Sequence, residues 1–177
     1  MKQSNRQLWK AWLPAIIWLC IIRIESTNYL SADNTSRFLY PVLHFLLGLD
    51  PARFEIWHHC IRKTGHFVGY FILSFLLFRA WRATLPIVPS AAWCLRWGTI
   101  AFLLTVLVAS LDEWHQTFLP SRTGTVRDVI LDSSAALVAQ IVIFMWLKGK
   151  AKWSKRELWF RPGDELKAKK SRALPSP

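Results

Sequence analysis

The chain has 177 residues, of which 53% are hydrophobic and 14% aromatic, and its formal charge is +12. This aromatic content excludes a disordered chain, and three cysteines are too few for a scaffold built on disulfides. The apolar residues are concentrated in a few long runs, whereas helices of soluble proteins alternate apolar and polar positions. The composition therefore predicts a membrane protein, and the length suits one domain.

Four apolar segments are candidates for membrane-spanning helices, which need about 20 mostly apolar residues. Segments 91–111 and 129–147 meet this length. Segments 8–24 and 66–81 have shorter uninterrupted cores, and they reach full length if flanking lysines and arginines extend their charges to the membrane interface. We therefore predict an all-α membrane protein with a bundle of four transmembrane helices.

The connection between the first two predicted spans, residues 25–63, contains an apolar run at 38–47 that is too short to cross a bilayer. Gly48 and Asp50-Pro51 follow this run and are typical of a chain break. We expect an interfacial or re-entrant helix in this first outer loop. Such a helix would cover polar residues held by the spans at the same level.

The distribution of charges predicts the orientation of the spans. Residues 1–10, 79–96 and those after Leu147 contain 16 of the 23 lysines and arginines but only three of the 11 acidic residues. By the positive-inside rule, both termini are cytoplasmic. Residues 1–148 then form the four-helix transmembrane domain, and residues 149–177 form a basic cytoplasmic tail. Since topology accounts for the positive charge, we expect membrane lipids and no nucleic acid as partners.

The first of three polar clusters lies where the second predicted span begins. At about 100° per residue, Lys63, His66 and Tyr70 fall within an arc of roughly 60° on one helix face. They offer a cation, a proton shuttle and a hydroxyl donor. Taken alone, the cluster fits equally well an interfacial lysine, an aromatic belt residue and a histidine bonded to a carbonyl.

The second polar cluster, Asp112, Glu113, His115 and Gln116, ends the third predicted span. Two adjacent carboxylates suit a general acid or base, and they equally suit ligands of a divalent cation. The alternative is that both face water, but acidic groups at the carboxyl end of a helix oppose its dipole. The unfavourable placement favours a functional role.

The third polar cluster precedes and enters the fourth predicted span. Pro120 and Gly124 predict a turn, and Thr125 is a candidate helix cap with Asp128 three residues later. A structural role in such a cap is sufficient to explain Asp128. Asp132 lies inside the span and needs a partner, a metal ion or a proton.

All three clusters are expected at one level on the outer side, where together they would form one pocket. The candidate catalytic residues are His66, Tyr70, Asp112, Glu113 and Asp128. The candidate ligand-binding residues are Lys63, Gln116, Arg122, Arg127 and Asp132. The cofactor is left open, with a divalent cation at Asp112, Glu113, Asp128 and Asp132 as the candidate.

At these residues the chain resembles the VanZ-like family of small bacterial membrane proteins. The matching motifs are K-x-x-H-F-x-x-Y at 63–70, D-E-x-x-Q with P-x-R at 112–122, and the first aspartate of D-x-x-x-N-x-x-G at Asp128. Asp132 and Ala135 stand where the family usually has Asn and Gly. The resemblance implies a protein of the bacterial cytoplasmic (inner) membrane, and it implies a link to teicoplanin resistance, with which the family's named member is associated.

Three classes of function fit these observations. The pocket could belong to an enzyme acting on an outer-leaflet lipid or lipid-linked cell-envelope precursor, with His66 or Glu113 as acid or base and Lys63 and Arg122 holding a phosphate. It could instead bind a lipid headgroup or a glycopeptide without altering it. A third reading is structural, with the charges forming a buried network that joins the helices. We slightly favour the enzyme over the binding module and leave the choice open.

Overall fold

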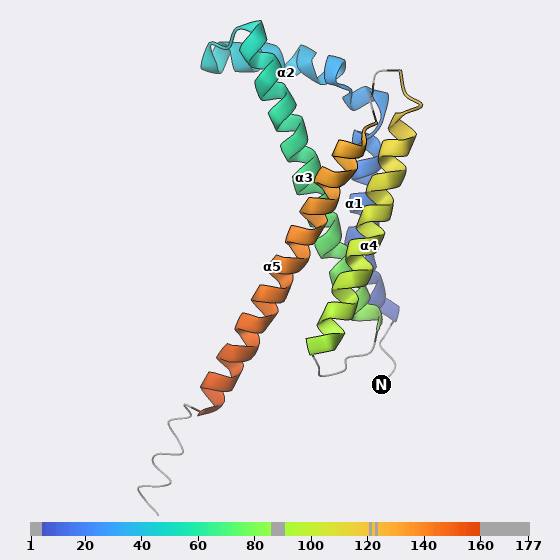
Figure 1. Ribbon diagram of the computed structural model, residues 1–177, viewed down its shortest axis with the longest axis vertical. Coiled ribbons are helices and arrows are strands. Elements are labelled where there is room, and N and C mark those ends of the chain that lie inside the picture. The colour runs from blue at the N-terminus through green and yellow to red at the C-terminus, as the bar shows by residue number, and fades with distance from the viewer. Residues whose placement is uncertain (1–4, 86–90, 121, 123, 160–177) are drawn as a thin grey trace, which may run out of the picture. The chain divides into compact units, whose positions relative to one another are not determined.

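The computed structural model describes residues 5–85, 91–120, 122 and 124–159, and within these residues it contains helices and no strands. The elements are α1 (Asn5–Glu25), the 3₁₀ helix η1 (Asn28–Leu30), α2 (Ala32–Leu47), α3 (Pro51–Thr84), α4 (Ala91–Gln116) and α5 (Val126–Trp159) (Figure 1). Four of them, α1, α3, α4 and α5, contain stretches long and apolar enough to cross a membrane. The predicted all-α fold with four helices of membrane-spanning length is confirmed.

The chain divides into two compact units, residues 1–141 and residues 142–177. In the first unit, α3 packs against both α1 and α4. Several core positions are alanines without exposed surface, which allow helices to approach closely; they are Ala15, Ala80, Ala101, Ala109, Ala135, Ala136 and Ala139. The second unit begins within α5 and contains the predicted tail, whose residues 160–177 lie outside the described residues.

Local capping signals explain where α2 and α3 begin and end. The Ser31 side chain caps the first turn of α2, and Gly48 ends the helix in the left-handed conformation at φ 62°. Asp50 then caps α3 by accepting a hydrogen bond from the backbone N–H of Arg53 at 2.9 Å, with Pro51 in the first turn. The predicted chain breaks at Gly48 and Asp50-Pro51 are confirmed.

The first half of α3 differs from the prediction, which placed a connection as far as residue 63. The helix begins at Pro51 and has 34 residues, so it extends about 51 Å, well beyond the ~30 Å hydrocarbon core of a bilayer. Residues 51–64 are rich in charged and polar side chains. A search for apolar runs therefore detects only the second half of this helix.

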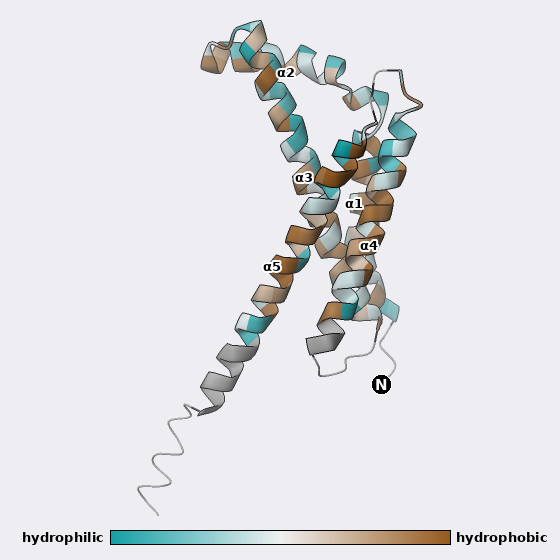
Figure 2. Ribbon diagram, in the orientation of Figure 1, coloured by the Kyte–Doolittle hydropathy of each residue, from teal (hydrophilic) through white to brown (hydrophobic). Residues whose placement is uncertain are grey.

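Large apolar side chains remain exposed on the long helices of the first unit. In Figure 2, hydrophobic residues extend along α4 and the first half of α5, whereas hydrophilic ones are frequent in α2 and the first half of α3. In a membrane, such exposed apolar side chains contact lipid tails. Examples are Trp9, Leu13, Ile17, Leu103, Leu107, Ile130 and Leu137.

Candidate functional site

The end of α4 and the start of α5 lie at the same end of the first unit as η1 (Figure 1). Buried charged side chains belong to this end; they are Asp112, Glu113, Arg122 and Asp132. At the rim, the Lys63 ammonium forms an ion pair with the Asp128 carboxylate. Their side chains are 35% and 17% exposed, so this rim pair is partly solvated. Thr125 caps α5 as predicted, because its hydroxyl accepts a hydrogen bond from the backbone N–H of Asp128 at 3.3 Å.

Deeper in the unit, a chain of hydrogen bonds through Asp112 and Gln116 connects α3 and α4 to Ser26, the residue after α1. The Tyr70 hydroxyl donates to Asp112 Oδ2 at 3.1 Å. The Gln116 amide donates to the same oxygen at 3.1 Å and to the Ser26 hydroxyl at 3.2 Å. All four side chains are buried. Asp112 is therefore held by two neutral donors, one from α3 and one from the next turn of its own helix.

The neighbouring acid, Glu113, is positioned by the connection between α4 and α5. Its Oε2 accepts a hydrogen bond from the backbone N–H of Thr125 at 2.9 Å, and the residue is 4% exposed. Gly124 makes this possible, because a Cβ there would lie 2.2 Å from the backbone oxygen of Glu113. The connection therefore folds directly back onto the end of α4.

Three ionisable side chains from three helices meet below the rim pair. His66, Glu113 and Asp132, which we call the inner cluster, each offer a ligand atom within 4.8 Å of the others. His66 Nδ1 lies 3.8 Å from Asp132 Oδ2, which is too long for a hydrogen bond. Asp132 has no exposed surface, and neither carboxylate oxygen has a hydrogen-bond partner among the described residues.

Arg122 holds the connection between α1 and α2. Its Nη2 donates to the backbone oxygens of Glu25, Thr27 at 3.1 Å and Leu30 at 2.8 Å. The side chain is only 9% exposed. Burial, followed by repulsion from Arg62, lowers the pKa of Arg122, but an arginine remains charged at neutral pH.

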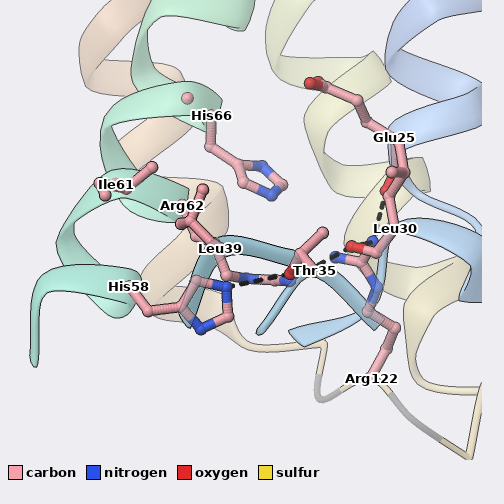
Figure 3. A pocket seen from close by; sticks show the side chains of 10 residues that line it. Glu25, Leu30, Thr35, Leu39, His58, Ile61, Arg62, His66 and Arg122 are labelled. Carbon is pink, nitrogen blue, oxygen red and sulfur yellow. Dashed lines mark hydrogen bonds between the residues drawn. The ribbon is translucent and has the colours of Figure 1, made fainter. Parts of the chain in front are cut away.

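A cavity of about 280 Å³ lies beside the inner cluster, lined by residues of α2, α3 and the connections around them. His58, Arg62 and His66 reach it from α3, and Arg122 reaches it from the opposite side (Figure 3). His58 Nε2 lies 2.9 Å from the hydroxyl of Thr35 on α2. The apolar part of the wall is formed by Leu30, Leu39 and Ile61.

The structure brings some of the predicted site residues together and separates others. Of the four carboxylates predicted as cation ligands, Glu113 and Asp132 meet, whereas Asp112 and Asp128 are bound elsewhere. Lys63 was predicted to hold a phosphate, but it is engaged by Asp128. Arg127, predicted as a ligand-binding residue, is exposed and contributes neither to the inner cluster nor to the lining of the cavity.

Arg62 and His58, which line the cavity, are not among the site residues predicted from the sequence. They precede His66 by four and eight residues, so one face of a continuous helix carries all three. This spacing is the signal that would have found them. Because residues 25–63 were predicted to form a connection, the helical spacing of His58 and Arg62 relative to His66 was not recognised.

Comparison with known proteins identifies the family. The VanZ/LLP1 family model matches residues 11–148. The chain is 30% identical over 158 residues to YwnJ, an uncharacterized membrane protein of Bacillus subtilis (strain 168), and the alignment covers 88% of this chain and 97% of the relative. No solved structure matches the chain. Since the family match includes all the polar clusters described above, this membrane protein belongs to the VanZ-like family.

Proposed function

We propose that this protein binds the anionic headgroup of a lipid, or of a lipid-linked cell-envelope precursor, at the outer leaflet of the bacterial cytoplasmic membrane. The observation that carries the proposal is the cavity beside the inner cluster, which combines two arginines with an apolar wall. Guanidinium groups match the geometry of phosphate oxygens. The apolar wall suits the start of a hydrocarbon chain next to such a headgroup.

Arg62 is the anion-binding group in this proposal. A guanidinium has five N–H donors, and the bond from Arg62 Nη1 to the backbone oxygen of Leu30, at 3.2 Å, orients the group beside the cavity. Arg122 already donates to three backbone oxygens, so it contributes positive charge more than direct contact. The two cations together favour a phosphate over a neutral headgroup.

The apolar side chains of α2 support a position of this helix at the membrane interface. No residue of α2 is buried, and Phe38, Phe45 and Leu46 are 80%, 87% and 66% exposed. A helix that combines such side chains with polar ones lies in the interface plane rather than across the bilayer. The cavity, lined in part by Thr35 and Leu39 of the same helix, would then open at the level of the headgroups.

The distribution of charge supports an outward-facing cavity. Lys10 lies in the first turns of α1, and Arg79 and Arg82 lie in the last turns of α3, at the opposite end of that helix from α2. Positive flanks are retained in the cytoplasm. We therefore place both termini inside, as in the sequence analysis, and the cavity on the outer side.

The size of the cavity favours a headgroup over a whole glycopeptide. About 280 Å³ lies below the range of ~300–1,000 Å³ typical of pockets that enclose a drug-sized ligand. His66 lines the cavity and also belongs to the inner cluster. In the enzymatic form of the proposal, His66 or Glu113 acts as acid or base on the bound headgroup; in the other form the protein only binds it.

Native mass spectrometry of the protein in nanodiscs tests the proposal. The probes are a polyprenyl phosphate and phosphatidylglycerol, with zwitterionic phosphatidylcholine for comparison. Wild type is expected to retain the anionic lipids, and Arg62→Gln is expected to weaken retention at least about tenfold, the cost of about 1.4 kcal/mol. Arg127→Gln, which changes an exposed arginine of α5, is the matched control and should bind as wild type.

Equal retention of all three lipids by wild type, or no effect of Arg62→Gln, would contradict the proposal. Incubation with the retained lipid then separates its two forms. A lipid product formed by wild type and not by His66→Gln supports the enzyme. An unchanged lipid in both supports the binding module.

A further inference from the structure

We propose that His66, Glu113 and Asp132 bind a divalent transition-metal ion of the Zn²⁺ type. The three residues come from α3, α4 and α5, and their ligand atoms lie within 4.8 Å of one another. One imidazole and two carboxylates are a donor set that zinc sites use, with a fourth position left for water or substrate. This inference stands on the inner cluster alone and does not depend on lipid binding.

The observed distances are close to those of a coordination sphere. Ligand atoms at 2.0–2.2 Å from a tetrahedral metal lie about 3.4 Å apart. His66 Nδ1 and Asp132 Oδ2 are 3.8 Å apart, so this pair needs to approach by only a few tenths of an ångström. The remaining pairs of ligand atoms lie within 4.8 Å, so they need to approach by up to about 1.4 Å, which side-chain rotation can supply.

The burial of Asp132 is a second, independent observation that points to a ligand. A buried carboxylate without a hydrogen-bond donor is costly. Asp132 has no exposed surface, and both its oxygens lack a hydrogen-bond partner among the described residues. A metal ion at the inner cluster would supply the missing positive charge.

Among the described residues, the Lys63 ammonium and the Arg122 Nη2 donate to groups outside the inner cluster. The Lys63 ammonium pairs with Asp128, and the Arg122 Nη2 donates to three backbone oxygens. Two carboxylates and a neutral imidazole carry a total charge of about −2, which a divalent ion balances. The backbone N–H of Thr125 fixes one oxygen of Glu113, as the outer partners of metal ligands do.

His66 also lines the cavity, so a metal at the inner cluster is accessible from it. The competing arrangement is a protonated His66 that pairs with Asp132 without a metal. A chelator distinguishes the two arrangements. Removal of metal would lower the thermal stability of a protein with a metal site and would leave the stability of a protein with a His66–Asp132 ion pair unchanged.

Isothermal titration calorimetry with Zn²⁺ alone tests the inference, using the full chain in mild detergent after treatment with EDTA. Wild type is expected to bind one ion per chain, and Asp132→Asn and His66→Gln are each expected to weaken binding at least about a hundredfold. Asp128→Asn, which changes a carboxylate one turn away on the same helix, is the matched control and should bind as wild type.

X-ray absorption of the wild-type zinc complex provides a measurement that does not depend on folding of a variant. It is expected to show only nitrogen and oxygen ligands at 2.0–2.2 Å, including one imidazole. Absence of binding by Zn²⁺ and Mn²⁺, or binding that Asp132→Asn and His66→Gln leave intact, would overturn the inference and favour the His66–Asp132 ion pair.

Discussion

In the middle of the first unit the buried polar side chains are neutral, whereas near α2 several of them carry charge. The Ser74 hydroxyl donates to the backbone oxygen of Ala136 at 3.2 Å, and Thr105 donates to that of Ala101 at 2.8 Å. Near α2, Asp112, Glu113, Arg122 and Asp132 are all buried. Charged groups inside a membrane protein are costly and concentrate at functional sites.

The two regions also differ in where their polar groups find partners. In the middle, the buried hydroxyl of Thr105 bonds to its own helix, and Ser74 bonds to one neighbouring helix. Near α2, Arg122 bonds to a connection more than 90 residues away in the sequence. In the middle, neutral groups therefore bond within one helix or between helices, whereas near α2 a buried charged group bonds to the backbone of a connection.

Removal of Arg122 is expected to produce the largest loss of stability. Arg122→Ala deletes the donor that three backbone oxygens between α1 and α2 share. Hydrogen bonds from a charged group contribute about 1.5–3 kcal/mol each, so the free energy of unfolding should fall by at least about 3 kcal/mol. Thermal unfolding in mild detergent measures the change. A loss no larger than that of Arg127→Ala, the exposed control, would show that the contacts contribute little.

Overpacking of the apolar middle of the first unit is expected to cause the second-largest loss of stability. Ala136 has no exposed surface, and the added side-chain volume of Ala136→Leu should cost about 1–3 kcal/mol. Val138→Leu, at a neighbouring position that is 40% exposed, should cost much less. Ala136→Leu changes none of the three side chains of the inner cluster, although it lies one turn from Asp132 on α5, so binding of Zn²⁺ by the folded variant should remain as in wild type. A selective loss of metal binding would break the distinction between the two regions.

The apolar middle is the part of the fold that sequence reasoning predicts best. A bilayer requires long apolar helices, so the runs of residues at 91–111 and 129–147 are sufficient to place α4 and α5. Gly48 and Asp50 likewise place chain breaks, because a left-handed glycine and a helix cap act locally. The charged first half of α3 has no such apolar signal.

The arrangement of the charged groups is less accessible from sequence, because it depends on how each helix is rotated. Asp112 and Glu113 are adjacent, and about 100° of helix rotation separates them. One consequently faces Tyr70 and the other faces Thr125. The partners of Arg122 are backbone oxygens, which leave no trace in the side-chain pattern. The positions of the three polar clusters at the ends of the predicted spans predict a shared polar pocket, but which side chains meet there depends on the tertiary structure.

Loss of the Tyr70 hydroxyl tests whether the polar end depends on its hydrogen bonds. Tyr70→Phe removes the donor at 3.1 Å from Asp112 Oδ2 and leaves the Gln116 amide as the remaining donor to that oxygen. A single buried hydrogen bond to a charged group contributes about 1.5–3 kcal/mol to the free energy of unfolding. Because the Gln116 amide remains as a donor, the loss should be near the lower value. Thermal unfolding of Tyr70→Phe and wild type in mild detergent measures this loss. A variant as stable as wild type would indicate that Asp112 does not need this donor.

The rim pair is expected to give the smallest effect, because solvent reaches it. Lys63→Met removes the ion pair with Asp128, but the lysine side chain is 35% exposed, so the loss should be below about 1 kcal/mol. Salt screens such a pair, and the difference between Lys63→Met and wild type should shrink further as salt is raised. Arg53→Met provides the exposed comparison, since the Arg53–Asp50 side chains are 75% and 56% exposed and their loss should be near zero. A salt-insensitive loss of several kcal/mol for Lys63→Met would instead place the rim pair with the buried charges, and the division between a solvated rim pair and the buried carboxylates Glu113 and Asp132 would have to be abandoned.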